Sequence, residues 1–181
     1  MKGKLIVVSG PSGSGKSTAT KLVRDMLQIP LSISATTRTP RAGEIDGKDY
    51  FFLEKEDFEK RITNGEFYEY ALVHGNYYGT LREEVESRIN SGQNVILEID
   101  VQGGLIVKEK NSEAILVFFK APSMEILAKR LEDRKTDSKE VIKLRLENAK
   151  KELEYEKDYD YTVVNDNLEK ACQELINIIN K

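Results

Sequence analysis

The sequence predicts an α/β fold in which a central sheet of parallel strands is covered by helices on both faces. The first observation is a set of four short apolar runs rich in β-branched residues: Lys4–Ser9, Val95–Ile99, Ala114–Phe119 and Tyr161–Val164. Near-continuous apolar runs of this kind are typical of parallel strands that helices cover on both sides. The second observation is that helical patterns separate these runs. Alternating strands and helices indicate a parallel-sheet core.

Apolar residues at helical spacing predict the covering helices. The first helix follows the first strand, and its apolar positions are Ala19, Leu22, Val23 and Met26. Three later helices are expected to begin behind residues whose side chains can accept hydrogen bonds from the free N–H groups of a first turn. These capping residues are Ser123, Ser138 and Asn167. The corresponding inward stripes are Met124, Leu127, Ala128 and Leu131; Ile142, Leu146, Ala149 and Leu153; and Ala171, Leu175 and Ile178.

Two segments interrupt the alternation of strands and helices. Residues 32–80 hold aromatic clusters and turn signals such as Asp46-Gly47, which predict a small β-rich insert with a short helix near Asp57–Thr63. Residues 122–155 form a second insert, which is helical and strongly charged. The remaining segments, residues 1–31, 81–121 and 156–181, are expected to form the core of one domain that spans residues 1–181.

The composition fits one domain and excludes several classes of protein. A chain of 181 residues corresponds to roughly one domain. Its 28 basic and 31 acidic residues give a net charge of −3, which argues against bulk binding of nucleic acid. No apolar run approaches the ~18–20 residues of a membrane-spanning helix, so no membrane partner is expected. The single cysteine, Cys172, excludes an internal disulfide or a multi-cysteine zinc site and fits a reducing, cytoplasmic setting.

A complete phosphate-binding motif follows the first strand. It matches G-x-x-x-x-G-K-[ST] and consists of Gly10, Pro11, Ser12, Gly13, Ser14, Gly15, Lys16 and Ser17, with Thr18 next in the helix. Glycines let successive N–H groups point at one anion, and the N-terminus of a helix adds partial positive charge. Lys16 would contact the β- and γ-phosphates, and Ser17 would offer its hydroxyl to Mg²⁺. The motif therefore predicts binding of a nucleoside triphosphate with magnesium and leaves the reaction open.

Two further patterns indicate polar sites. Asp100 follows the apolar run Val95–Ile99, at the edge of a parallel sheet where ligands bind. Its carboxylate can orient Mg²⁺-bound water or accept a hydrogen bond from a substrate, or it can simply cap the next helix. Arg38 and Arg41 lie three residues apart beside hydroxyl side chains. Two guanidinium groups in such a segment make a clamp for an anionic group such as a phosphate.

On several motifs in one order, the sequence resembles the guanylate kinase family. Besides the phosphate loop, these motifs are Ser34–Glu44 (SATTRTPRAGE), Gly47–Phe52 (GKDYFF), Gly65–Glu69 (GEFYE), His74–Thr80 (HGNYYGT) and Leu97–Gly103 (LEIDVQG). The resemblance runs from Leu5 to about Asp166. It implies transfer of the γ-phosphoryl group of ATP, bound with Mg²⁺, to GMP, which gives ADP and GDP. It also implies a P-loop kinase core with a five-stranded parallel sheet, a GMP-binding insert at residues 32–80 and a helical lid at residues 122–155.

The resemblance further implies roles for individual residues. Those that would hold the GMP phosphate are Ser34, Arg38, Arg41, Tyr50 and Tyr78. Those that would form the guanine site are Glu69, Gly79, Thr80 and Asp100. Arg134 and Arg145 of the lid would join Lys16 at the transferring phosphoryl group. Asn165 and Asp166 would line the adenine side. The metal would be held by Ser17 and, through water, by Asp100.

Four residues near these motifs receive no direct role. Arg130 shares a helix face with Arg134, and its function is left open. His74 is assigned to local structure, because the acceptor phosphate is already largely dianionic and needs no general base. Gly104 stands where the family commonly has alanine, and Lys135 where a small or polar residue is usual. Neither difference removes a functional group.

Two other functions compete with this one. The first is a kinase for AMP or dTMP, against which the carboxylate of Glu69 and the motifs of the insert argue. The second is a non-enzymatic guanylate-kinase-like module that binds peptides, and such modules typically lack the phosphate loop. The expected partners are therefore ATP and GMP, with acceptance of dGMP left open. No nucleic acid, membrane or obligate protein partner is expected.

Overall fold

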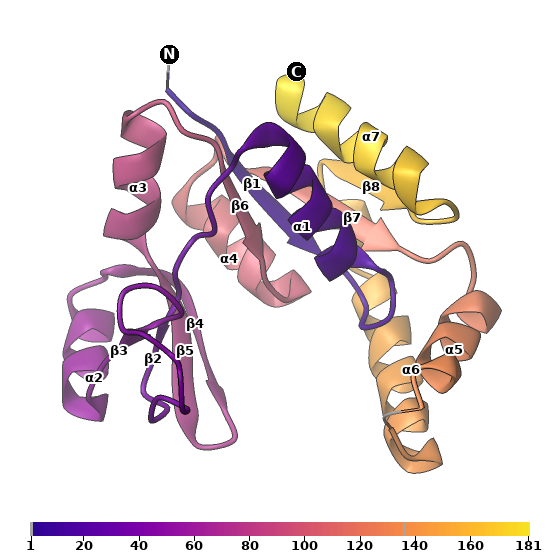
Figure 1. Cartoon of the computed structure of the whole chain (residues 1–181), viewed down its shortest axis with the longest axis horizontal. Helices are drawn as coiled ribbons and strands as arrows, with labels where there is room; N and C mark the ends of the chain where they lie inside the picture. Colours follow the sequence, from indigo (N-terminus) through magenta and orange to yellow (C-terminus); the bar gives the residue numbers. More distant parts are fainter. Residues whose placement is uncertain (1, 136) are drawn as a thin grey trace.

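The computed structural model describes residues 2–135 and 137–181 and holds two separate sheets (Figure 1). The main sheet has the strand order β6-β1-β7-β8, and all neighbouring strands in it are parallel. Its strands are β1 (Leu5–Ser9), β6 (Val95–Glu98), β7 (Ile115–Lys120) and β8 (Tyr161–Val164). The four apolar runs are thus confirmed as strands, with ends that differ from the predicted ones by one residue at most.

The expectation of five strands in this sheet is wrong, because the described part of the chain places four strands there. Residues 29–34, between the first helix and the second sheet, form no strand. Pro30 has no N–H group to donate to a ladder. The Ile33 N–H donates to the Glu84 carboxylate at 3.4 Å, and the Ser34 carbonyl accepts from the Phe51 N–H at 2.9 Å. The backbone of Ile33 and Ser34 is therefore bonded to the Glu84 side chain and to Phe51 of the second sheet, and not to a strand of the main sheet.

Helices cover both faces of the main sheet, as predicted. The helices of one face are α1 (Lys16–Leu27) and α7 (Leu168–Asn180). The helices of the other face are α3 (Arg82–Asn90) and α4 (Val101–Lys110). No helix within the described ranges is long and apolar enough to cross a membrane.

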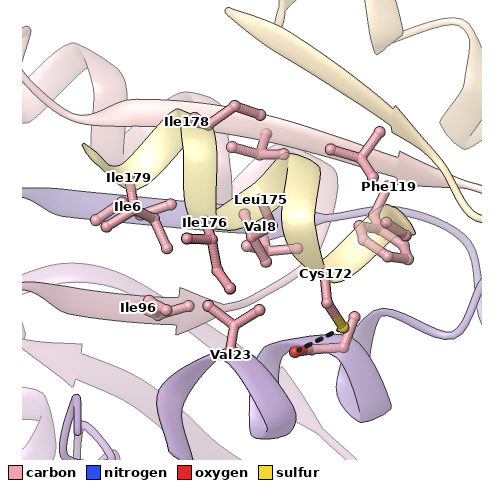
Figure 2. Close-up of a cluster of buried hydrophobic side chains, with 14 of the residues drawn as sticks. Ile6, Val8, Val23, Ile96, Phe119, Cys172, Leu175, Ile176, Ile178 and Ile179 are labelled. Carbon is pink, nitrogen blue, oxygen red and sulfur yellow. Dashed lines mark hydrogen bonds between the residues drawn. The ribbon is translucent and has the colours of Figure 1, made fainter. Parts of the chain in front are cut away.

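Alternate residues of the strands serve the two layers of the core. In β1, Ile6 and Val8 pack with α1 and α7, whereas Leu5 and Val7 pack with α3 and α4. Figure 2 shows the first layer, where side chains of α7 lie over those of β1 and β6. Full burial of one such aliphatic side chain stabilises the fold by roughly 1.5–3 kcal/mol. The two layers together hold the loops at the carboxyl ends of the strands in place.

The buried face of α1 differs from the sequence-based prediction. Ala19 and Val23 are buried, but Leu22 and Met26 are 39% and 64% exposed. Thr20 is buried in their place, because its hydroxyl donates to the Glu98 carboxylate at the end of β6, at 3.0 Å. The buried side of this helix therefore combines the apolar Ala19 and Val23 with a polar contact of Thr20.

A second sheet is built from residues 35–81 and has the order β3-β2-β5-β4. Its elements are β2 (Ala35–Thr36), β3 (Phe51–Phe52), α2 (Lys55–Thr63), β4 (Phe67–Val73) and β5 (Asn76–Leu81). Phe58 stacks on Phe67 and Tyr77, with ring centroids 4.3 and 5.0 Å apart, at the centre of its small core. His74 and Gly75 form the turn between β4 and β5 with φ of 49° and 82°, so the exposed His74 lies in a hairpin turn.

Two packed helices, α5 (Met124–Asp133) and α6 (Lys139–Leu153), follow β7, and the short η1 (Glu156–Asp158) leads into β8. The predicted caps are confirmed. Ser123 Oγ accepts from the Ile126 N–H, Ser138 Oγ accepts from the Val141 N–H, and Asn167 caps α7 in the same way. The second sheet and the α5–α6 pair both lie below the main sheet in the view of Figure 1, on either side of the loop between β1 and α1.

Candidate functional site

The loop between β1 and α1 has the geometry of an anion cradle. Gly13 and Gly15 both have a φ of 88°, a left-handed backbone conformation that glycine adopts without strain. Gly15 is also the N-cap of α1, and because it has no side chain it leaves the N–H groups of the first turn open to a ligand. Within this turn, which the structure describes in full, no acidic side chain offsets the positive end of the helix.

Lys16 is partly buried beside this loop, and its Nζ donates to the Pro11 carbonyl at 3.4 Å. Burial lowers the pKa of the Lys16 ammonium group, the carboxylates of Glu98 and Glu152 oppose that shift, and Arg134 adds to it. A desolvated ammonium group whose hydrogen bond to the protein is long interacts strongly with any anion that enters. Lys16 is therefore placed to exchange the Pro11 carbonyl for a phosphate oxygen.

Glu98, at the end of β6, is a site residue that the sequence-based prediction missed. Its carboxylate accepts hydrogen bonds from Ser17 Oγ and, at 3.0 Å, from Thr20 Oγ1. The contact with Ser17 spans 81 positions of the sequence, so no local motif reports it. The one available signal was a carboxylate within an otherwise apolar strand. Hydroxyl and carboxylate oxygens side by side are the hard ligands that Mg²⁺ takes, so Ser17 and Glu98 fit a magnesium ion.

Asp100 lies at the N-cap of α4, where its Oδ1 accepts from the Gly103 N–H. Helix capping, one of the alternatives that the sequence left open, is therefore part of its role. Its carboxylate also lies close to that of Glu69. A Cβ at Gly103 would come within 2.9 Å of Asp100 Oδ1 and 3.6 Å of Glu69 Oε2. The Asp100 carboxylate therefore lies near that of Glu69, whereas the carboxylate that contacts Ser17 is that of Glu98.

Glu69 and Thr80 are paired across β4 and β5, and Thr80 Oγ1 donates to Glu69 Oε1 at 2.6 Å. Burial raises the pKa of Glu69, the hydrogen bond from Thr80 opposes the shift, and the Asp100 carboxylate adds to it. Gly79 beside them is required by packing, because a Cβ there would lie 2.9 Å from the Phe67 ring. The Glu69 carboxylate is thus partly shielded from water, and one of its oxygens is bound by Thr80. Such a carboxylate is a strong acceptor for hydrogen-bond donors on a ligand.

Arg38 is the centre of a charged and aromatic cluster on the second sheet. Its guanidinium group donates to both carboxylate oxygens of Glu44, at 2.8 and 3.0 Å. It also lies over the rings of Tyr50 and Phe52, 5.5 and 5.8 Å from their centroids. Tyr50 meets Tyr78 edge to face at 6.1 Å. Glu44 is a second residue that the prediction missed, and it orients the guanidinium group before any ligand arrives.

Ser34 and Arg41 lie at the border of this cluster. The Arg41 backbone N–H donates to the Glu44 carboxylate at 2.7 Å, and the Arg41 side chain is exposed. Ser34 lines a cavity of about 310 Å³ that also reaches Ser17, Glu98 and Thr80. The cavity therefore connects the phosphate loop with the hydroxyl that holds Glu69.

Both arginines assigned to the lid lie next to the phosphate loop. Arg145 of α6 donates from Nη1 to Ser12 Oγ at 2.8 Å, and its Nε pairs with Asp137 at 3.4 Å. Arg134, which follows α5, lines a cavity of about 490 Å³ beside the loop. The other residues that line this cavity are Gly13, Gly15, Thr18, Arg130, Asp133, Asn165, Asp166 and Leu168. Arg134 of the lid and the predicted adenine-side residues, Asn165 and Asp166, thus line one cavity.

Asn165 is tied to the loop. Its side chain is 6% exposed and donates from Nδ2 to the Ser14 carbonyl at 2.8 Å. The backbone carbonyl of Asn165 accepts from Arg130 Nη2 at 2.8 Å, which gives Arg130 a structural contact. A Cβ at Gly15 would overlap the Asn165 amide. Asn165 therefore shapes the loop, while Asp166 is exposed at the rim of the cavity.

Comparison with known proteins agrees with this geometry. The family model described as guanylate kinase matches residues 2–181. The chain belongs to the guanylate kinase family. The guanylate kinase of Fusobacterium nucleatum is 60% identical over 98% of this chain and 96% of that protein. The guanylate kinase of Thermotoga maritima is 48% identical over 99% of this chain and 87% of that protein.

Solved structures give the same result. The crystal structure of guanylate kinase from Anaplasma phagocytophilum has a TM-score of 0.73 and 34% identity, and the match covers 99% of this chain and 85% of that chain. A gluconokinase from Sinorhizobium meliloti has a TM-score of 0.53 and 18% identity over 98% of this chain and 91% of that chain. The second likeness shows the fold alone, an α/β P-loop kinase fold shared with kinases of other names.

Glu152 is a further acidic residue of the site that the sequence analysis did not single out. It lies on α6 two turns after Arg145 and hence on the same face of the helix. Burial raises the pKa of the Glu152 carboxyl, while the Lys16 ammonium group opposes the shift. The α5–α6 unit thus presents charges of both signs to the loop, with Arg145 at Ser12 and Glu152 near Lys16.

Proposed function

We propose that this protein transfers the γ-phosphoryl group of ATP to GMP and releases ADP and GDP. The observation that carries the proposal is one cavity that joins Ser17 of the phosphate loop to Thr80, whose hydroxyl holds the partly buried carboxylate of Glu69. A site for phosphates and a carboxylate suited to guanine are therefore connected through one space. Membership in the guanylate kinase family supports the same reaction.

The phosphate loop is the donor side of this proposal. Its N–H groups and Lys16 would hold the phosphates of ATP. The base would lie toward the cavity of about 490 Å³, where Asp166 is exposed and Asn165 supports the loop. Mg²⁺ would be held by Ser17 and Glu98, with Asp100 available through water, and when bound it would neutralise charge on the phosphate oxygens.

Replacing Glu98 with glutamine is expected to lower kcat by about 10²-fold. It should also raise the Mg²⁺ concentration needed for half-maximal activity, because one carboxylate ligand becomes a neutral amide. The measurement is a magnesium titration of the steady-state rate at saturating ATP and GMP. Glu109→Gln, on the exposed side of α4, is the matched control. An unchanged magnesium requirement in Glu98→Gln would show that the metal is held elsewhere.

Residues 32–80 are the acceptor side, the GMP-binding insert of this proposal. Its phosphate-binding residues would be Ser34, Arg38, Arg41, Tyr50 and Tyr78. Its guanine-binding residues would be Glu69, Gly79 and Thr80, joined from the core by Asp100. Arg38 supports this assignment, because Glu44 and two aromatic rings already fix the orientation of its guanidinium group. A bidentate group in that state loses little freedom when it binds a phosphate.

Catalysis in this arrangement consists of positioning and charge stabilisation. The acceptor phosphate has a second pKa of about 6 and is largely dianionic at neutral pH, so it attacks without a general base. Lys16, Arg134 and Arg145 would stabilise the charge on the group in transfer. The lid, residues 122–155, would exclude water, which otherwise competes with GMP as the acceptor. The core would comprise residues 1–31, 81–121 and 156–181 of one domain, in a cytoplasmic setting that suits the free, buried Cys172.

Arg145→Ala is expected to lower kcat by about 10²–10³-fold, because one donor to the transferring group is lost. The structure already holds Arg145 against Ser12 of the loop, so the side chain needs only a short movement to reach a phosphate. Lys143→Ala, on the exposed face of α6, is the control. Turnover by Arg145→Ala equal to that of the wild type would remove this arginine from the mechanism.

Full closure of the lid is expected to need both nucleotides, because Arg134 and Arg145 must converge on one phosphoryl group. Small-angle scattering should show a smaller radius of gyration with GMP plus a non-hydrolysable ATP analogue than with either alone. A radius that stays constant across these states would contradict closure.

The reaction itself can be followed by phosphorus NMR of a mixture of ATP, GMP and Mg²⁺. The proposal requires ADP and GDP to appear in equal amounts. Formation of ADP with free phosphate in place of GDP would identify a hydrolase, and the absence of ADP would reject the proposal.

A further inference from the structure

The first turn of α4, which carries Asp100, is fastened to the main sheet by two hydroxyl groups. Ser9 Oγ, at the end of β1, donates to the Asp100 carbonyl at 3.2 Å. Tyr159 Oη, shortly before β8, donates to the Val101 carbonyl at 3.0 Å. Because these bonds hold the N-cap and the first residue of the helix, they also hold the direction of the Asp100 side chain, whose Oδ1 is bound by the Gly103 N–H.

Tyr159 is held firmly in this place. Its ring meets that of the fully buried Phe118 edge to face, with centroids 5.5 Å apart and planes at 82°. Burial raises the pKa of Tyr159 to about 12, and the carboxylates of Asp100 and Glu152 add to the shift. The phenol therefore keeps its proton at neutral pH and remains a donor to the Val101 carbonyl.

The absence of a side chain at Gly104 leaves space beside α4 for the Tyr159 hydroxyl. Gly104 lies inside α4, where glycine is about 1 kcal/mol less favourable than alanine. Its Cβ, if present, would overlap Tyr159 Oη and come within 3.2 Å of both Ser9 Oγ and Tyr159 Cζ. The hydroxyl of Tyr159 thus occupies the space that a side chain at position 104 would need. An alanine here would force the Tyr159 hydroxyl to move from its present place.

We infer that Tyr159, seated against Gly104, is a positioning residue for the acceptor nucleotide. It would fix the first turn of α4 and so keep the distance between the Asp100 and Glu69 carboxylates constant. Oxygens of the two carboxylates lie 2.9 and 3.6 Å from where the Cβ of Gly103 would be, so a small shift of this turn changes their spacing. The inference rests on the proposed function, in which both acids face guanine.

Tyr159→Phe removes only the hydroxyl. It is expected to raise KM for GMP by about fivefold, the cost of one lost hydrogen bond, and to leave kcat and KM for ATP within about twofold of wild type. Tyr161→Phe is the matched control, because this half-buried tyrosine lies two positions away, on β8, and lines neither cavity of the site. An unchanged KM for GMP in Tyr159→Phe, or an equal rise in KM for ATP, would overturn the inference.

Gly104→Ala supplies a second, independent test, because the new methyl group and the hydroxyl cannot share one space. The single variant is expected to raise KM for GMP by about tenfold or more. Adding Tyr159→Phe should bring KM back to the value of Tyr159→Phe alone, because the methyl group then fills the space that the hydroxyl leaves. A double variant as impaired as Gly104→Ala would overturn the inference, since the defect would then not pass through the hydroxyl.

Asp100→Ala separates failure of this inference from failure of the proposed function. If Asp100→Ala raises KM for GMP and Tyr159→Phe does not, Asp100 acts on the acceptor and only the positioning role of Tyr159 is wrong. If Asp100→Ala also leaves KM for GMP unchanged, the placement of guanine is wrong and the positioning role falls with it.

Discussion

Replacing Lys16 with methionine is expected to lower kcat by about 10²–10³-fold while the protein stays folded. The surroundings of Lys16 explain both the expected loss of activity and the expected retention of the fold. The ammonium group is partly buried and burial lowers its pKa. Within the described residues, the hydrogen bond of its Nζ goes to the Pro11 carbonyl, at a long 3.4 Å. Little stabilisation is lost when this charge is removed, so the melting temperature should barely change. In the proposed mechanism, in contrast, the phosphates would lose a cation that stabilises the group in transfer.

The measurement is a steady-state rate at saturating substrates, together with a melting curve of the free protein. Lys55→Met is the control, because Lys55 is 66% exposed on α2 and makes only a long pair with Glu59 at 3.9 Å. Near-normal turnover in Lys16→Met would reject the assignment of the loop to the donor phosphates. A large drop in melting temperature would show that Lys16 supports the fold instead.

Replacing Glu69 with glutamine is expected to remove most of the preference for guanine. Guanine presents adjacent N1–H and N2–H₂ donors, which a carboxylate can accept together, whereas adenine presents a bare N1 acceptor. A site built for such hydrogen bonds rejects the wrong base by about 10⁴–10⁵-fold. In glutamine one oxygen can still accept from Thr80, as Oε1 does at 2.6 Å, but the other becomes an amide donor that faces the donors of guanine.

The ratio of kcat/KM for GMP to that for AMP should therefore fall by about 10²-fold or more in Glu69→Gln. KM for ATP should stay nearly unchanged, because Glu69 lies in the second sheet and not at the phosphate loop. Glu66→Gln is the control, since Glu66 lies just before β4 and pairs with Arg61 at 3.1 Å. If the GMP/AMP ratio survives in Glu69→Gln, guanine is recognised elsewhere.

The parts of the fold that the sequence predicts well are those fixed by local pattern. The four strands of the main sheet and the caps at Ser123, Ser138 and Asn167 follow from apolar runs and side-chain chemistry within a few residues. The exposed Leu22 does not follow from such a pattern. Helical spacing alone could not reveal that Thr20 turns inward to meet a carboxylate 78 positions away.

The candidate site also has a part that local sequence predicts and a part that depends on tertiary packing. A phosphate site at the loop between β1 and α1 was predicted from the sequence, because the glycines, the lysine and the following helix are consecutive in the chain. Glu98 was not, since its meeting with Ser17 depends on β6 lying beside β1. Glu152 and Tyr159 reach the same region from the far end of the chain, and only the packing of α6 and the approach to β8 bring them there.

A coupled assay of ADP release with GMP, AMP, dTMP and CMP as acceptors tests the central claim most directly. The claim is that one cavity joins a donor phosphate site to Thr80, whose hydroxyl holds the carboxylate that selects guanine. It predicts a kcat/KM for GMP that exceeds that for AMP by about 10⁴–10⁵-fold, with dTMP and CMP also used poorly. A value for any of the other three within about tenfold of that for GMP would contradict it, because a site of buried hydrogen bonds cannot treat a mismatched base so nearly alike.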